Sequence, residues 1–325
     1  MHTQVMDQSM DELEESIGSS LGTVEGLRVE AGKVEEFARA IGSNDPVLLG
    51  TKLPPKASAV PAPPTFTRTA VFPRYRPDDL ADIQDAALGF DLGFDDEYRV
   101  HGEHEYEFER PLFVGDTLTG ESTLTDAYQR PGRGEEPLTF AVLETEYRDE
   151  EGERVLTERA TFIETPTGFS GGRTSDETTY EVGETSIGER ARAVEEVAVG
   201  DKGPRIVETV DRRDFVRYAG AGGGLDRYHY DEPYARAAGY ESVFGQGMLA
   251  AGFASRVITH WFGIEAIDRF ATRFLAPIWP DDRIAFEGEV TDQDEHGAEI
   301  ELVSKNQRGE AVLSGTASVS PDSES

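Results

Sequence analysis

The stretch "GMLAAGFASRVITHWFG" (residues 247–263) decides the fold, because apolar residues recur in it at helical spacing. Every fourth residue from Leu249 to Trp261 is large or branched and apolar, and most residues between them are also apolar. A helix that is apolar over most of its surface has to be buried on most sides. The stretch therefore predicts a central helix that other elements enclose.

Long alternating stretches follow this helix, and a similar set occurs earlier in the chain. Residues 275–295 and 297–320 alternate apolar and polar side chains and contain the turn "NQRGEA". Residues 109–129 and 138–164 repeat the pattern with the turn "DEEGER". Upstream of each set, "VEEFARAIGSNDPVLL" (34–49) matches "RRDFVRYAGAGGGLDR" (212–227), and both predict short helices. The patterns indicate two related blocks, each with antiparallel hairpins.

The two blocks predict an α+β fold with two tandem units, each an antiparallel sheet wrapped around a central helix. We expect a flexible lead-in over residues 1–23, a first unit over 24–165, a Gly- and Ser-rich linker over 166–193 and a second unit over 194–320. Two sheet edges buried against each other would give one continuous sheet. The sequence leaves open whether the chain acts alone or as a homodimer.

The composition excludes several classes of function. The 325 residues carry 64 acidic against 31 basic side chains, a formal net charge of -33. Such a surface repels phosphate backbones and anionic lipids, so we expect neither nucleic acid nor membrane as a partner. Cysteine is absent, which excludes disulfides and thiolate chemistry. No signal peptide or apolar span is evident, and we expect a cytoplasmic protein.

The bias of the charged residues predicts a dependence on salt. Only five of the 31 basic residues are lysines, a pattern that resembles proteins of salt-in halophiles. Molar salt shortens the Debye length to about 3 Å and screens the repulsion among the acidic groups. We expect the thermal unfolding temperature in molar KCl to fall when the salt is diluted away. An unchanged unfolding temperature and activity in dilute buffer would contradict this prediction.

Several motifs together resemble one known family. They are "RYAG", "HYDEPYARAAGY", "VFGQGML" and "FLAPIWPDDRI" in the second unit, and "FARAIGSNDP", "APPTF", "HGEHEYEFERPLFVGDTL" and "VLETEYRDEEGERV" in the first. The chain is similar over nearly its whole length to the MaoC-like branch of the hot-dog superfamily, which contains (R)-specific enoyl-CoA hydratases and 3-hydroxyacyl-thioester dehydratases. The resemblance implies reversible hydration of a 2-enoyl-CoA, with acyl-CoA as the substrate, no cofactor and no metal.

The resemblance also implies the site residues. The family loop Ser-Gly-Asp-x-Asn-x-x-His falls on residues 222–229, so that its His matches His229, while its Asp falls on Gly224 and its Asn on Asp226. We expect His229 as the base, Asp226 as its carboxylate partner and the Gly247 N–H as the oxyanion donor. The implied substrate-binding residues are Gly223, Gly224, Tyr228, Gln246 and Met248. Ser255, about two turns after Gly247 on the same helix, would either reach the pocket and bind substrate or pack as a small residue. The first unit has no histidine at the position of His229 and is expected to be the non-catalytic half.

Other polar residues have more ordinary explanations. Asp231 suits the start of a helix over residues 233–238 as its cap. His101 and His104 fall on opposite faces of an alternating strand, which disfavours a metal site. The basic group Arg68, Arg74 and Arg76 would either receive CoA phosphates or form a solvated face.

Two other functions stay open because Gly224 replaces the family carboxylate. The first is a degenerate protein that binds acyl-CoA without hydrating it. The second is a hot-dog thioesterase.

Overall fold

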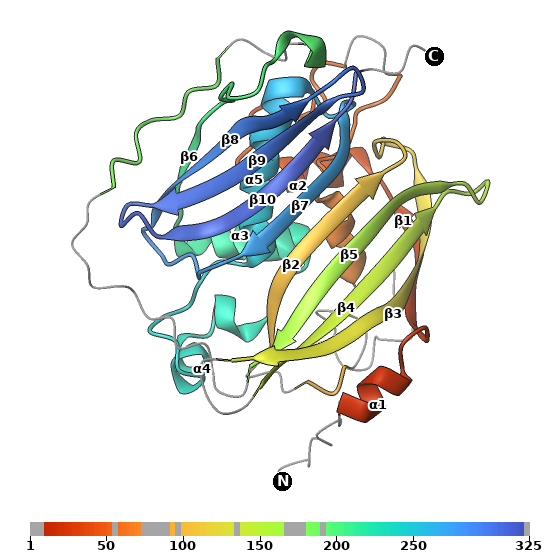
Figure 1. Ribbon diagram of the computed structural model, residues 1–325, viewed down its shortest axis with the longest axis vertical. Coiled ribbons are helices and arrows are strands. Elements are labelled where there is room, and N and C mark those ends of the chain that lie inside the picture. The colour runs from red at the N-terminus through yellow and green to blue at the C-terminus, as the bar shows by residue number, and fades with distance from the viewer. Residues whose placement is uncertain are drawn as a thin grey trace.

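The computed structural model describes residues 10–53, 58–72, 92–94, 99–132, 137–165, 180–188 and 193–321. Within these ranges the strands form one antiparallel sheet in the order β1-β3-β4-β5-β2-β7-β10-β9-β8-β6 (Figure 1). The first unit supplies β1 (Ser20–Arg28), β2 (Arg99–Phe108), β3 (Thr117–Pro131), β4 (Pro137–Arg148) and β5 (Arg154–Glu164). The second supplies β6 (Ile206–Thr209), β7 (Ile267–Phe274), β8 (Arg283–Gln293), β9 (Ala298–Asn306) and β10 (Ala311–Val319).

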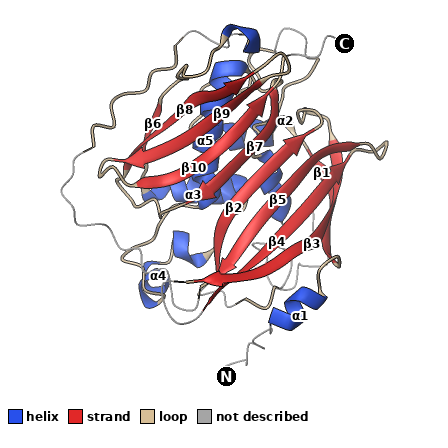
Figure 2. Ribbon diagram, in the orientation of Figure 1, coloured by secondary structure: helices blue, strands red, loops and turns tan. Residues whose placement is uncertain are grey.

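The longer helices lie behind the sheet in Figure 2, and the short helices lie near its lower edge. The helices are α1 (Met10–Glu15), α2 (Ala31–Ala40), α3 (Arg212–Gly222), α4 (Glu232–Ala237) and α5 (Gly247–Phe262), with short 3-10 turns η1 (Phe66–Val71), η4 (Val194–Glu196) and η5 (Arg227–His229). The expected α+β class and the two tandem units are confirmed. The units join where β2 pairs antiparallel with β7, as the expectation of a continuous sheet requires.

Helix α5 is the centre of the second unit. Every residue of the helix except Gly247 is buried, and the helix packs against β6, β7, β8 and β10. This burial confirms the prediction made from its apolar surface. In the first unit, a central helix would have to follow η1, and most of the chain between η1 and β2 lies outside the described residues.

The predicted hairpins and short helices are also confirmed. Residues 149–153 turn between β4 and β5, and residues 307–310 turn between β9 and β10. Helices α2 and α3 fall in the two matching stretches and pack against each other. Phe37 and Phe215, which occupy equivalent positions in the two stretches, are both fully buried.

The lead-in differs from the expectation of a loose segment. It contains α1, whose Leu13 is buried in a cluster with Leu124 and Leu143. It also contains the start of β1, where Ser20 pairs with Thr123 of β3. Apolar burial and edge pairing order this stretch although its composition is polar.

The linker prediction lies partly outside the described residues. The described segment 180–188 contacts the second unit, because Ser186 forms a β-bridge with Arg205. No helix in the described part of the chain is long and apolar enough to cross a membrane.

Candidate active site

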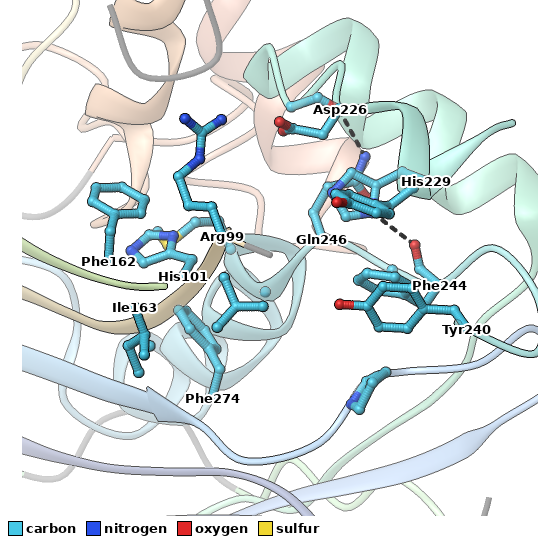
Figure 3. Close-up of a pocket in the computed structure, with 18 of the residues that line it drawn as sticks. Arg99, His101, Phe162, Ile163, Asp226, His229, Tyr240, Phe244, Gln246 and Phe274 are labelled. Carbon is cyan, nitrogen blue, oxygen red and sulfur yellow. Dashed lines mark hydrogen bonds between the residues drawn. The ribbon is translucent and has the colours of Figure 1, made fainter. Parts of the chain in front are cut away.

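A cavity of about 490 Å³ lies between the two units. The second unit contributes residues of the loop 224–229, the turn 244–248 and the end of β7, and the first unit contributes the start of β2 and the end of β5. Figure 3 shows His101 and Phe162 on one side and His229 on the other. Among the described lining residues, Asp226 is the only carboxylate, against the three arginines Arg68, Arg99 and Arg227. The cavity is therefore less acidic than the chain as a whole.

His229 is held in the 3-10 turn η5 that follows α3. Gly223 ends α3 in the left-handed conformation (φ 77°), which glycine adopts at little cost, and the chain then turns into the loop. His229 Nδ1 lies 2.8 Å from the carbonyl oxygen of Phe244. Nδ1–H is therefore the donor, and Nε2, which has no partner among the described residues, carries the lone pair.

The surroundings of His229 favour the neutral ring. Burial lowers its pKa from 6.5, and this effect outweighs the charge of Asp226 and the Phe244 hydrogen bond, which raise it. The positive charge of Arg68 adds to the lowering. A neutral imidazole with a free Nε2 can accept a proton near pH 7.

Asp226 interacts with His229 through charge and not through a hydrogen bond between side chains. Its backbone carbonyl accepts a bond from the His229 N–H at 3.1 Å, which is drawn in Figure 3. Among the described residues, the Asp226 carboxylate makes no hydrogen bond with the imidazole. The carboxylate lines the same cavity and raises the pKa of the ring electrostatically.

Gly247 begins α5 at the wall of the cavity. The cap residue Gln246 makes no side-chain bond to the helix, and no described residue accepts a bond from the Gly247 N–H. A first-turn N–H has no partner within its own helix, and the helix dipole favours negative charge there. A Cβ on Gly247 would lie 3.1–3.2 Å from the ring of Phe274, which packs against this turn.

Gln246 occupies the space beside Gly224. Its Nε2 donates to the carbonyl oxygens of Phe215 and Gly224, both at 3.1 Å. A Cβ on Gly224 would lie 3.0 Å from Gln246 Cγ. The Gln246 side chain, just before Gly247, thus fills the space into which a side chain at position 224 would extend.

The other expected residues divide into two groups. Gly224, Tyr228, Gln246 and Met248 line the cavity together with His229, Asp226 and Gly247. Gly223 and Ser255 do not line it, which contradicts the expected contact of Gly223 with substrate and the substrate-binding alternative for Ser255. A Cβ on Gly223 would meet Val71 at 2.3 Å, because this glycine faces the first unit. Ser255 is 1% exposed and donates to Gly252 within α5, so its role is packing.

The expectation for His101 and His104 was wrong about their faces. The pairing of β2 with β5 is irregular between His101 and Glu103, and this irregularity breaks the alternation. The two rings therefore meet, with His104 Nδ1 3.0 Å from His101 Nε2. No cluster of three metal-ligating side chains is found in the part of the chain that the structure describes.

Two further expectations can be placed. Asp231 caps α4 by accepting a bond from the Tyr234 N–H, which confirms its capping role. Arg68 faces the cavity, and Arg74 and Arg76 lie outside the described residues.

Four aromatic lining residues were not predicted from the sequence: Phe162, Tyr240, Phe244 and Phe274. Tyr240, Phe244 and Phe274 stand in the quoted motifs, but no pattern there marks them as lining residues, and Phe162 of the first unit joins the cavity only when the units pair.

Comparisons with known proteins agree with this architecture. Residues 15–158 match the family described as "FAS1-like, dehydratase domain region", and residues 185–311 match the family described as "MaoC like domain". A solved protein of Mycobacterium tuberculosis is described as having a double hot-dog fold, and its match covers 95% of this chain and 97% of that one. The TM-score is 0.60 and the sequence identity is 13%. The chain therefore has the double hot-dog fold.

Two relatives are more similar in sequence. A solved "MaoC-like dehydratase" is 25% identical, with a TM-score of 0.74, and the match covers 95% of this chain and 99% of that one. A UPF0336 protein of Streptomyces avermitilis is 31% identical over 146 residues, which are 43% of this chain and 87% of that protein. The chain belongs to the MaoC-like dehydratase family, with a FAS1-like dehydratase region as its N-terminal part.

Proposed function

We propose that this protein reversibly hydrates a 2-enoyl-CoA thioester to the (R)-3-hydroxyacyl-CoA. The observation that supports the proposal is the placement on one cavity of His229 Nε2 and the Gly247 N–H, neither of which has a hydrogen-bond partner among the described residues. The first is a base for water and the second a donor for a thioester oxygen, which are two of the groups that hydration needs.

The reaction uses these groups in order. His229 Nε2 takes a proton from a water molecule as the water oxygen bonds to C3 of the substrate. The electron pair of the C2–C3 double bond moves toward the thioester carbonyl, and the oxygen that becomes negative accepts the Gly247 N–H. C2 then takes the proton held on His229 Nε2 as the carbonyl re-forms, which restores the neutral imidazole and completes the addition of one water. Dehydration runs through the same steps in reverse.

Asp226 serves in this proposal as an electrostatic partner of His229. Its carboxylate raises the pKa of the imidazole against the effect of burial and thereby keeps the ring basic. We expect Asp226→Asn to lose most of the rate, about tenfold in kcat/KM. Steady-state hydration of crotonyl-CoA measures this loss. A rate equal to that of the wild type would remove Asp226 from the mechanism.

The pH dependence follows from the direction of the His229 shift. A base acts only when unprotonated, and burial lowers the pKa of His229 below 6.5. We expect kcat/KM to be constant above this value and to decline on acidification with an apparent pKa below 6.5. In Asp226→Asn the decline should move to still lower pH, because the charge that raises the pKa is gone. A decline of kcat/KM that moves to higher pH in Asp226→Asn would contradict the role of His229 as the base and of Asp226 as the charge that raises its pKa.

One incubation separates the proposal from its alternatives. Purified protein and crotonyl-CoA should give 3-hydroxybutyryl-CoA without release of free thiol. Thiol release would show a thioesterase. Thermal stabilisation by the ligand without any product would show a binding protein that has lost catalysis.

A further inference from the structure

A second, small cavity of about 40 Å³ adjoins the proposed active site inside the first unit. Arg68, His101 and Phe162 line both cavities. Figure 3 shows His101 and Phe162 side by side on the wall opposite His229. Their rings stack at 4.8 Å, and the His101 ring also packs edge-on against Phe274 at 5.1 Å. The His101 and Phe162 rings therefore form part of the wall that the two cavities share.

The small cavity is polar although it lies beneath the sheet of the first unit. The Thr67 hydroxyl donates to Glu158 Oε2 at 2.6 Å, and His104 Nε2 lies 3.0 Å from Glu158 Oε1. On the neighbouring strands, where Thr145 pairs with Glu158 and Ser122 pairs with Thr145, the hydroxyls of Ser122 and Thr145 are 2.8 Å apart. These hydrogen bonds offset the cost of burying the polar groups, and each hydroxyl keeps a lone pair that can accept a bond from a further group.

Glu158 and Arg68 are the one carboxylate and the one arginine among the described residues that line this small cavity. Burial alone would raise the pKa of Glu158, but His104, the Thr67 hydroxyl and Arg68 lower it overall, so the carboxylate is ionised. Its negative charge offsets the positive charge of Arg68. Burial, with the charges of His104 and Arg68, holds the pKa of His101 well below its usual value, although a backbone bond at Glu103 opposes the shift. Among its described carboxylate and guanidinium groups, the pocket thus has one charge of each sign, together with several hydrogen-bonding side chains.

We propose that the small cavity is a subsite for an uncharged polar group, a hydroxyl or ketone, at the far end of the acyl chain. The inference rests on the proposed function, because the thioester must lie at Gly247 for the chain to extend toward His101. Phe274 supports this direction, since its ring packs against both Gly247 and His101. A volume of about 40 Å³ holds a hydroxymethyl group or a few water molecules.

The first test compares substrates on the wild-type protein. 2-Enoyl-CoA thioesters of increasing length are prepared in matched sets that end in a methyl, a hydroxymethyl or a carboxylate. At the length that reaches the subsite, we expect kcat/KM for the hydroxyl-ended member to exceed that of the methyl-ended member by at least about tenfold, because a site built for hydrogen bonds rejects an analogue without them. The carboxylate-ended member should be poorer than the hydroxyl-ended one.

The second test changes the subsite. In Ser122→Ala/Thr145→Val both partners of one hydroxyl pair are removed together, so neither is left unpaired. This double variant should lose most of the preference for the hydroxyl. Thr125→Val is the matched control, because Thr125 is an exposed threonine on the same strand as Ser122, and it should keep the preference.

The outcomes distinguish this inference from the proposed function. Hydration of crotonyl-CoA by the wild type supports the function whatever the subsite does. Equal or better use of the methyl-ended substrate at every length would overturn the inference and leave the small cavity as a site for water. A higher kcat/KM for the carboxylate-ended substrate than for the other two would overturn the proposal that the subsite binds an uncharged group.

Discussion

Replacing His229 by glutamine is expected to lower kcat/KM for crotonyl-CoA by about 10²–10⁴-fold, the usual contribution of a positioned acid–base group. Glutamine can keep a hydrogen bond to the Phe244 carbonyl, which His229 Nδ1 contacts at 2.8 Å, but it cannot take a proton from water. The loss should therefore appear in kcat, with little change in the affinity for the thioester.

The control for this variant is His296→Gln. The His296 side chain is 83% exposed and lies outside the cavity, so its replacement should leave the rate unchanged. Thermal unfolding of His229→Gln should stay close to that of the wild type. Rates within twofold for His229→Gln and the wild type, with both folded, would show that another group activates the water.

Gly247→Pro should remove the oxyanion donor while keeping the start of the helix. Proline is tolerated at the first helical position, and the preceding residue Gln246 is already extended (φ -60°, ψ 136°), as a residue before proline must be. Only the Gly247 N–H is lost. Removal of one such donor typically costs about 10²–10³ in kcat.

The variant Gly247→Ala separates the effect of losing the N–H donor from the effect of crowding the Phe274 ring. Both variants place a Cβ near the Phe274 ring, where 3.1–3.2 Å is available, but alanine keeps its N–H. We expect Gly247→Ala to retain much more activity than Gly247→Pro. Equal rates in the two variants would mean that the N–H at this position does not stabilise the reaction.

The fold was predictable because its signals are local. The apolar surface of residues 247–263, the alternating strands and the glycine-containing turns each depend on neighbours in the sequence, and all three were confirmed. The lead-in was mispredicted because the burial of Leu13 depends on contacts with Leu124 and Leu143, which lie far along the chain.

The site was predictable only in part, for the same reason. The loop that holds His229 and the turn at Gly247 are short motifs, and both do line the cavity. The meeting of His101 with His104 depends on an irregular strand pairing that no alternation pattern reveals. The contact of Gln246 with Gly224 joins two loops and was likewise invisible in the sequence.

The stereochemistry of the reverse reaction is a direct test of the proposed (R)-specific hydration. The protein is incubated separately with (R)- and (S)-3-hydroxybutyryl-CoA, and formation of crotonyl-CoA is followed. We expect the (R) thioester to be dehydrated and the (S) thioester to remain unchanged. Turnover of the (S) thioester, or of neither by folded protein at its preferred salt concentration, would contradict this proposal.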